Sequence, residues 1–477
     1  MYIALTALLP LLGGALMPVI GLKTERARDI YTEAVTVLAS IGVFAVLLFA
    51  PAKELTLFKL NQNFACVFRM DGLGRLFALL VAALWPFASL YAFEYMRHAE
   101  RTGNFFAFYT IAYGVTLLIA CAGNLFTLYI FYECLTVVTL PLVEHEWNKE
   151  AFRAGRAYLM YLIGGATLGF AAMIITSCAS GGAAFTPGGA VPGGADAGLM
   201  RLAFVLAFMG FGAKAALFPL CGWLPKASVA PTPVTALLHA VAVVNAGVFS
   251  VARCAGYVFG FELAQSTWAQ YVPMALSAFT VLYGAVRAVR ETHLKRRLAW
   301  STVSNLSYML FALSLLTKDG FAAGITHMVF HSLMKIVLFF CAGAVMVKTG
   351  KKDIHEMRGL AKRMPFTLAA FAVAGLALTG VPPLAGFTSK YLIITAALQR
   401  GGLWAVAGCV SLIISAVLTA VYIFTFLVPA FYAPETGGGE ERADMGMPMK
   451  ISTAAICLML IAVSLLSGDA VRLIRGL

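Results

Sequence analysis

Residues 214–226 read KAALFPLCGWLPK, so that a lysine and two prolines interrupt an otherwise apolar segment. A second stretch, residues 380–390, reads GVPPLAGFTSK and again places prolines beside a lysine. Proline removes a backbone donor and frees a carbonyl, and membrane helices are broken in this way where they line a cavity. We therefore expect helix breaks at Pro219 and at Pro382 and Pro383.

The chain around these stretches is too apolar for a water-soluble protein. It has 477 residues, of which 61% are hydrophobic and 12% are charged, and its mean hydropathy is +0.86. Soluble domains carry roughly 25% charged residues, and about 20 apolar residues in a helix span a bilayer. Apolar runs of this kind lie near residues 2–21, 31–50, 72–95, 104–123, 125–143, 156–179, 200–219, 232–251, 269–288, 298–316, 321–346, 366–395, 403–431 and 450–467. The sequence predicts an all-α polytopic membrane protein with about 14 transmembrane helices.

The two interrupted stretches divide this single membrane domain, residues 1–477, into parts. One break in each half of the chain is typical of transporters built from inverted repeats. We expect a first repeat over residues 104–251 and a second over residues 269–431, each of about five helices with one broken helix. Residues 1–103 then hold the N-terminal spans, and residues 450–467 form a C-terminal span.

The distribution of basic residues predicts the orientation in the membrane. Loops after the odd-numbered runs hold 22 of the 35 lysines and arginines, and the positive-inside rule places such loops in the cytoplasm. Both termini are then expected on the outer face of the inner (cytoplasmic) membrane. The net charge of +13 is explained by basic loops that orient the chain in the membrane and by attraction to anionic lipids. Nucleic acid is therefore not an expected partner.

The sequence contains no motif for a bound cofactor. Its nine cysteines are scattered singly without a C-x-x-C pair, which argues against an iron–sulfur cluster, a zinc ribbon or a disulfide framework. It also lacks a G-x-x-x-x-G-K-[ST] loop, so nucleotide hydrolysis is not its energy source. We expect no cofactor and no metal in this chain.

Three lysines and one glutamate lie inside the apolar runs, namely Lys214, Lys335, Lys390 and Glu133. A lysine at the bilayer centre costs at least about 2.5–3.5 kcal/mol, and burial favours the neutral amine. Each lysine is therefore a candidate proton carrier. A static buried ion pair is the alternative for Glu133 and Lys214, but packed apolar residues replace such pairs at little loss, which favours a function.

A regular file of titratable residues follows in the second half of the chain. His327, His331 and Lys335 recur every fourth residue in GITHMVFHSLMK, residues 324–335. Four residues advance a helix by about 6 Å, and imidazole near its natural pKa relays protons well, so we interpret the file as a proton relay. A zinc site and ordinary core histidines are the alternatives. The motif lacks a third metal ligand, and Lys335 would repel the ion.

Six segments point to a known family: KAALFPLCGWLPKA from residue 214, PTPVTALLHA from 231, LKRRLAWSTVSN from 294, HMVFHSLMKIVLF from 327, GLAKRMP from 359 and GVPPLAGFTSK from 380. In this order they resemble the antiporter-like, proton-translocating subunits of complex I and of energy-converting membrane hydrogenases, and the D subunit of Mrp-type antiporters. The resemblance covers roughly residues 70–430. It implies fourteen helices, two inverted five-helix repeats with one broken helix in each, and a hydrophilic axis along the membrane midplane.

The resemblance also implies roles for individual residues. Glu133 is similar to a fifth-span glutamate that pairs with a seventh-span lysine, here Lys214. The expected relay continues through an eighth-span histidine, an eleventh-span file and a terminal twelfth-span lysine, which are His239, then His327, His331 and Lys335, and finally Lys390.

Four positions depart from the family pattern. Asn245 stands where many members have a central lysine, Cys221 where they have histidine, and Lys226 and His293 where they have aspartates. We expect His239 with water to carry the middle step in place of the missing lysine. An impaired channel is the alternative.

The expected function is H⁺ translocation in a redox-driven pump, either complex I-like or of the hydrogenase type. Opening and closing of the Glu133–Lys214 pair would set the proton affinity of the lysine. Other membrane subunits would connect the chain to a cofactor-bearing redox module, because this chain performs no redox chemistry. H⁺ is favoured over Na⁺, since hard cations need several oxygen ligands. The alternatives are the D subunit of an Mrp-type Na⁺/H⁺ antiporter and a non-conducting structural membrane anchor.

Overall fold

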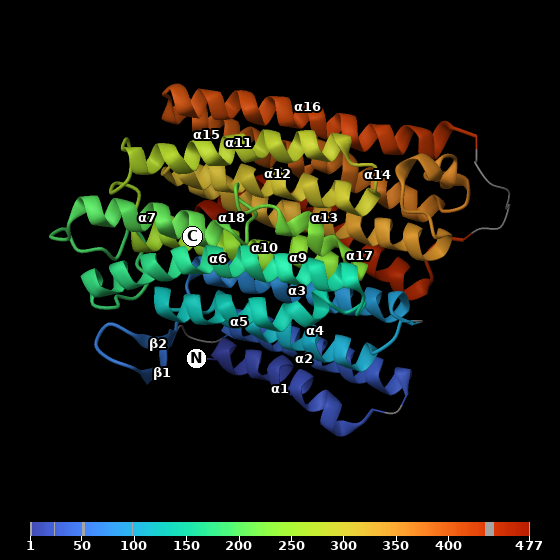
Figure 1. The fold of residues 1–477 in the computed structure, drawn as a ribbon, viewed down its shortest axis with the longest axis horizontal. Coiled ribbons are helices and arrows are strands. Elements are labelled where there is room, and N and C mark those ends of the chain that lie inside the picture. Colours follow the sequence, from blue (N-terminus) through green and yellow to red (C-terminus); the bar gives the residue numbers. More distant parts are fainter. Residues whose placement is uncertain (1, 23, 50–52, 98, 435–442, 477) are drawn as a thin grey trace.

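The computed structural model describes residues 2–22, 24–49, 53–97, 99–434 and 443–476. The described chain is a bundle of roughly parallel and antiparallel helices with one β-hairpin at its edge (Figure 1). Strands β1 (Leu55–Lys59) and β2 (Ala65–Phe68) form the antiparallel hairpin. The helices are α1 (Tyr2–Ile20), α2 (Glu25–Phe49), α3 (Gly72–Tyr95), α4 (Thr102–Ala120), α5 (Leu125–Val143), α6 (Lys149–Ser180), α7 (Ala197–Gly212), α8 (Trp223–Lys226), α9 (Thr232–Ala240), α10 (Val243–Arg253), α11 (Trp268–Arg290), α12 (Leu294–Ser314), α13 (Lys318–Thr349), α14 (Pro365–Thr379), α15 (Ala385–Arg400), α16 (Leu403–Tyr432), α17 (Met447–Leu465) and α18 (Ser467–Arg475).

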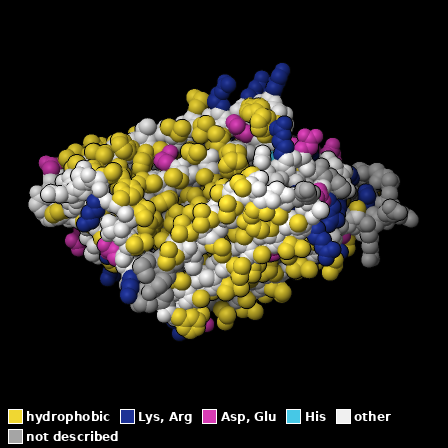
Figure 2. All heavy atoms as spheres, turned by 90° about the horizontal axis from the view of Figure 1, so that it is seen from below, with side chains coloured by type: hydrophobic (Ala, Val, Ile, Leu, Met, Phe, Trp, Pro, Cys, Tyr) yellow, Lys and Arg dark blue, Asp and Glu magenta, His cyan; other side chains and the backbone are white. Residues whose placement is uncertain are grey.

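The helices have the length and composition of membrane spans. In the described chain, ten helical segments are long and apolar enough to cross a bilayer, and α1, α7 and α14 contribute shorter apolar helices. Apolar side chains also cover much of the face seen in Figure 2. The prediction of a multi-pass α-helical membrane protein is therefore confirmed. The count of 14 spans and the repeat boundaries stay predictions.

Both predicted helix breaks are present. Helix α7 ends at Gly212, before a series of turns that contains Pro219. Helix α14 ends at Thr379, before the turn that contains Pro382 and Pro383. A proline leaves one carbonyl of the preceding turn without a backbone donor, which is compatible with the irregular backbone of both stretches.

A third break separates α9 from α10 at Val241 and Ala242. The sequence carries no local signal for this break, because residues 240–244 read AVAVV and contain neither glycine nor proline. The first predicted repeat therefore holds two interrupted helices, whereas one was expected. The new break lies directly after His239.

The two ends of the bundle differ in what they carry. We call one the hairpin end, because it holds β1 and β2, the glycine-rich loop 181–196 and both ends of the chain (Figure 1). We call the other the basic end, because it holds the loop 350–364 and the side at which Lys and Arg gather in Figure 2. Two bases of the charge count, Lys23 and Arg442, lie outside the described residues. The assignment of the hairpin end to the outside stays a prediction.

Helix α12 is polar and enclosed. All of its residues except Arg296 are buried, and it packs against α11 and α13. Several of its polar groups have partners: Ser304 Oγ donates to Val281 O at 2.8 Å, and Asn305 Nδ2 donates to Ser301 O at 2.7 Å. Ser307 Oγ and Asn305 Oδ1 are buried without a hydrogen-bond partner in the protein. A hydrophilic helix therefore runs through the interior of the bundle.

Three basic residues just outside the predicted apolar runs, where loops are expected, are buried instead. They are Arg253 at the end of α10, and Lys295 and Arg297 in the first turn of α12. Lys295 Nζ donates to Ala230 O, and Arg297 Nη1 donates to Tyr422 O at 2.9 Å. A long side chain near a helix end can reach a free acceptor on a segment that is distant in the sequence. Such an acceptor cannot be predicted from the neighbouring residues.

Arg253 forms a buried ion pair at the hairpin end. Its Nη2 donates to Asp71 Oδ1 at 2.7 Å, and its Nη1 donates to the other carboxylate oxygen. The guanidinium carbon also lies 4.8–5.0 Å from the ring centroids of Phe185, Phe249 and Tyr257. Asp71 caps α3, so the pair joins α3 to α10.

Replacing Arg253 by methionine is expected to destabilise the folded chain by about 3–5 kcal/mol, because it leaves the Asp71 carboxylate without its partner. The midpoint of thermal unfolding in detergent, followed by circular dichroism, measures the effect. The double variant Asp71→Asn, Arg253→Met should recover part of the loss, since the neutral amide still caps α3. The exposed Arg75→Met is the control, and an unchanged midpoint in Arg253→Met would contradict this assignment.

Candidate functional site

Glu133 and Lys214 lie beside each other in the first half of the bundle. Glu133 is on α5 with 25% of its side chain exposed, and Lys214 is fully buried in the turns after α7. The Oε1 atom of Glu133 is 3.9 Å from Lys214 Nζ and has no hydrogen-bond partner. The carboxylate can therefore move away from the amine without breaking a hydrogen bond.

Backbone and aromatic groups hold the amine of Lys214. Its Nζ donates to Tyr132 O and lies 3.4 Å from the centroid of the Tyr132 ring. The Tyr132 hydroxyl donates to Phe211 O at 3.0 Å, so it satisfies a carbonyl at the end of α7. Gly247 of α10 also packs on Lys214, and a Cβ at this glycine would lie 2.5 Å from Ala215 N. The lysine is thus held between α5 and α10.

His239 occupies the last turn of α9, directly before the third break. It is fully buried, and neither ring nitrogen has a hydrogen-bond partner in the protein. Its ring lies 4.9 Å from the ring of Phe339 on α13. Buried polar groups without a protein partner are uncommon, and they are explained by ordered water or by a functional role.

Asn245 joins the two sides of this break. Its Nδ2 donates to Ala240 O at 2.7 Å, a carbonyl that the break leaves free. The same nitrogen donates to Ser332 Oγ on α13 at 2.8 Å. The amide therefore has a structural role at the position where the family resemblance implies a lysine.

His327, His331 and Lys335 lie along one face of α13 and are fully buried. The ring centroids of the two histidines are 6.0 Å apart, and neither nitrogen of His331 has a partner. Lys335 Nζ donates to Leu298 O at 3.0 Å and to Ser301 Oγ. Since both acceptors are on α12, the file ends against the polar helix.

Lys390 lies beyond the second predicted break, on α15. Its Nζ donates to Leu378 O at 2.7 Å and to Thr379 O at 3.1 Å, which are carbonyls at the end of α14. A helix C-terminus carries partial negative charge, so the break provides a site for an ammonium group. The neighbouring Ser389 Oγ is 2.8 Å from His327 Nδ1, which connects α15 to the histidine file.

The structure therefore arranges the predicted residues in two groups. Glu133 and Lys214 form one, and the other five side chains lie on α9, α13 and α15. Helix α10 lies between the groups, because its Gly247 packs on Lys214 and its Asn245 bonds to α13. Within the described residues, no hydrogen bond or ion pair joins the groups directly.

One buried amine, that of Lys295, was not predicted from the sequence. A zinc site at the histidine file was one of the alternatives. Lys295 is buried near the basic end, but it stands in the run KRR at residues 295–297, which is typical of a loop. As for metals, the part of the chain that the structure describes brings together no three His, Cys, Asp or Glu side chains able to hold an ion.

Comparison with known proteins places this arrangement in a family. Residues 122–419 match the family described as NADH:quinone oxidoreductase/Mrp antiporter, TM, and this match covers more than half of the chain. The chain belongs to this family. The resemblance predicted from the sequence is thereby confirmed.

Two members of the NADH:quinone oxidoreductase/Mrp antiporter family illustrate the relationship. Hydrogenase-4 component B of Escherichia coli (strain K12) is 31% identical over 446 residues, which cover 88% of this chain and 64% of that protein. NADH-quinone oxidoreductase subunit L of Mycobacterium tuberculosis (strain CDC 1551 / Oshkosh) is 32% identical over 389 residues, which cover 80% of this chain and 60% of that protein. The chain thus spans less than two thirds of the length of these relatives.

Two solved structures of the family share the fold. One is a chain of the membrane-bound sulfane sulfur reductase, an archaeal respiratory membrane complex, with a TM-score of 0.87 and 24% identity over 99% of this chain and 96% of that chain. The other is a chain of the Mrp complex from Dietzia sp. DQ12-45-1b, with a TM-score of 0.85 and 21% identity over 100% of this chain and 52% of that chain. Both are chains of membrane complexes, and the comparison shows that this chain has their fold.

Proposed function

We propose that this chain moves protons across the inner membrane as one subunit of a redox-driven complex, either complex I-like or of the hydrogenase type. The observation that carries the proposal is a set of ionisable side chains, all buried, at helix breaks and on one face of α13: Lys214, His239, His327, His331, Lys335 and Lys390. Burying such groups costs free energy, and packed apolar residues would avoid this cost. Their presence therefore favours a function.

The Glu133–Lys214 pair is the proposed loading step. With the carboxylate near the amine, Coulomb attraction stabilises the ammonium form, and in a poorly screened interior this attraction is worth several kcal/mol. With the carboxylate away, burial favours release of the proton from Lys214. The 3.9 Å separation without a hydrogen bond supports a pair that opens and closes.

The released proton then moves to the second group. Asn245 cannot ionise, so water must carry the proton from Lys214 to His239 along α10. From there the proton passes to the file on α13, whose histidine rings are 6.0 Å apart. The contact of 2.8 Å between His327 Nδ1 and Ser389 Oγ supports transfer towards Lys390.

Transport at a fixed pH is expected to be independent of sodium. The buried sites offer amines and imidazoles, whereas Na⁺ requires several oxygen ligands, and Glu133 is the only carboxylate among them. Proton uptake into vesicles that contain the native complex is followed with a pH-sensitive dye, and sodium chloride is exchanged for choline chloride at equal ionic strength. A rate that rises with sodium at fixed pH would refute the choice of ion.

The proposed partners are other membrane subunits and, through them, a cofactor-bearing redox module. Purifying the native assembly and identifying its companions by mass spectrometry tests this part. Hydrogenase or quinone-reductase subunits would support the redox-driven complex. Small antiporter subunits alone would replace it with an Mrp-type Na⁺/H⁺ antiporter.

A further inference from the structure

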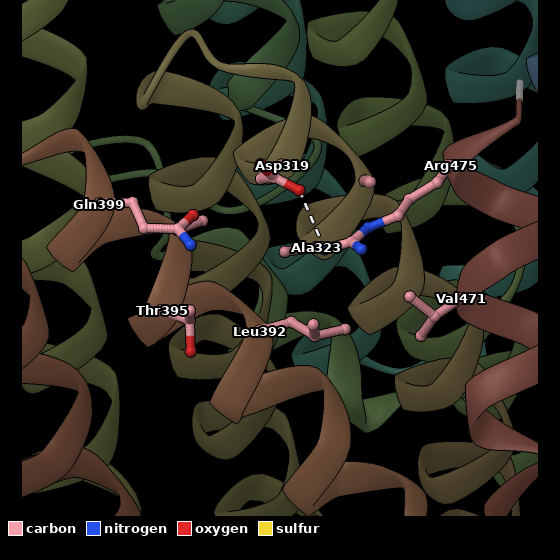
Figure 3. Close-up of a pocket in the computed structure, with 9 residues that line it drawn as sticks. Asp319, Ala323, Leu392, Thr395, Gln399, Val471 and Arg475 are labelled. Atoms are coloured by element: carbon pink, nitrogen blue, oxygen red, sulfur yellow. Dashed lines mark ion pairs between the residues drawn. The ribbon is translucent and has the colours of Figure 1, made fainter.

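A small cavity opens at the hairpin end between α13, α15 and α18 (Figure 3). Its volume is about 30 Å³, and it is lined by residues of these three helices, among them Asp319, Ala323, Thr395, Gln399 and Arg475. A space of this size holds a water molecule. None of these residues belongs to the relay described above.

The cavity continues the line of the histidine file. Asp319, Ala323 and His327 are spaced by four residues on α13, so successive members of this row are about 6 Å apart along the helix. On α15, which packs against α13, Leu392 and Ala396 follow Ser389 at helical spacing and also line the cavity. The cavity therefore lies one helical turn beyond the contact between His327 and Ser389.

Small and polar side chains line the cavity beyond the contact between His327 and Ser389. Ala323 lines the cavity and stands one helical turn before His327 on α13, so a small side chain separates this part of the cavity from the imidazole. The Nε2 atom of His327 is buried and has no hydrogen-bond partner in the protein. Thr395 and Gln399 supply polar groups near the opening, and Gln399 is directed towards the cavity in Figure 3.

Two of the residues that line the cavity form an ion pair at its exposed side. Arg475 Nη2 of α18 is 2.9 Å from Asp319 Oδ1, and the two side chains are 53% and 52% exposed. Helix α18 is anchored by the buried side chains of Val471 and Ile474. A pair of this exposure is weak, so it can open without unfolding the helix.

We propose that this cavity is the mouth through which the relay releases protons at the hairpin end, and that the Asp319–Arg475 pair is its gate. The proposal rests on the proposed function and adds the place of release. A proton on His327 Nε2 passes to water in the cavity, the imidazole returns to its neutral form, and the hydronium ion exchanges with the solvent beyond Asp319. Asp319 and Arg475 act as positioning residues and need not bind the proton themselves.

Thiol labelling tests the mouth independently of transport. Ala323→Cys is made in a Cys178→Ser background, and a membrane-impermeant methanethiosulfonate is added to one side or the other of vesicles that hold the native complex. Cys178 of the unmodified chain is exposed near the end of α6 at the hairpin end, so its labelling marks the side that this end faces. The thiol at position 323 should react from that side only. Adding Arg475→Ala should raise its labelling rate about two- to fivefold, the range expected for an exposed ion pair.

Two controls complete this experiment. A cysteine at the fully buried Ala344, on the same helix but far from the cavity, should stay unlabelled with and without Arg475→Ala. Ala323→Leu, which fills the cavity, should lose most of the proton transport, whereas Ala372→Leu on α14 should keep it.

The outcomes separate the two proposals when His331→Leu is measured in the same vesicles. An unlabelled thiol at position 323, or normal transport in Ala323→Leu, overturns the mouth, and loss of transport in His331→Leu then leaves the relay standing. Normal transport in His331→Leu overturns the relay and the mouth together. Labelling from the hairpin side with loss of transport in both leucine variants supports both proposals.

Discussion

Replacing Lys214 by methionine is expected to reduce proton transport by the native complex to below about 1% of the wild-type rate, in line with the effect of removing a proton-transferring side chain. The amine is fully buried beside Glu133, and methionine fills its volume without a charge. Glu133→Gln should have the same consequence, because a neutral amide exerts no Coulomb attraction on the ammonium group of Lys214, whether it is near or away. Dye-monitored proton uptake into vesicles measures both rates.

Assembly must be intact for this result to have meaning. The native complex carrying each variant should purify with the wild-type set of companions. The matched control for the lysine is Lys226→Met, since Lys226 is exposed on α8 in the same interrupted segment. The matched control for the glutamate is the exposed Glu150→Gln at the start of α6. Wild-type rates in Lys214→Met or Glu133→Gln would favour the structural anchor.

The second large effect is expected for His331→Leu, which should abolish proton transport and leave stability unchanged or slightly increased. Both ring nitrogens of His331 are buried without partners, so the histidine adds an unfavourable polar group to the folded chain. Leucine removes that group and keeps the packing. A structural histidine would show the opposite behaviour, with lower stability and normal transport.

Two measurements on one preparation decide this prediction. The midpoint of thermal unfolding reports stability, and proton uptake reports transport. The exposed His355→Leu in the loop at the basic end is the control for both. Retention of more than half of the wild-type transport in His331→Leu would exclude this residue from the relay.

The features that were predictable from the sequence are those with a local signature. Pro219 and the Pro382–Pro383 pair mark the two breaks because they stand beside lysines within apolar runs, whereas prolines inside α1, α3, α5, α11 and α16 leave those helices continuous. The spacing of His327, His331 and Lys335 requires only that α13 is a regular helix. The lysines inside apolar runs were recognisable because their neighbours are uniformly apolar. Each of these inferences uses fewer than twenty consecutive residues.

The features that escaped prediction depend on partners far away in the chain. The α9–α10 break has no proline, and one of the contacts that support it comes from Ser332, almost ninety residues after Asn245. Lys295 stands in a charged run that is typical of a loop, and the acceptor of its buried amine, Ala230 O, lies on another segment. Asp71 and Arg253 are 182 residues apart. No local pattern connects such pairs.

Asn245 occupies the middle of the proposed relay, between Lys214 and His239. A lysine at this position would place a second charge near His239, whereas the amide bonds to Ala240 O and Ser332 Oγ and fixes the break. The absence of the lysine therefore does not leave a defect in packing. Under the proposed function, water and His239 carry this step.

The hydrophilic character of α12 has a consequence for how the protein is made. A segment with four serines, one threonine and one asparagine, and with Lys295, Arg296 and Arg297 at its start, partitions poorly into lipid by itself, because charged residues are costly there. In the finished bundle, partners for these polar groups are supplied largely by α11, α13 and α16. We therefore expect α12 to be stably inserted only together with the helices that enclose it.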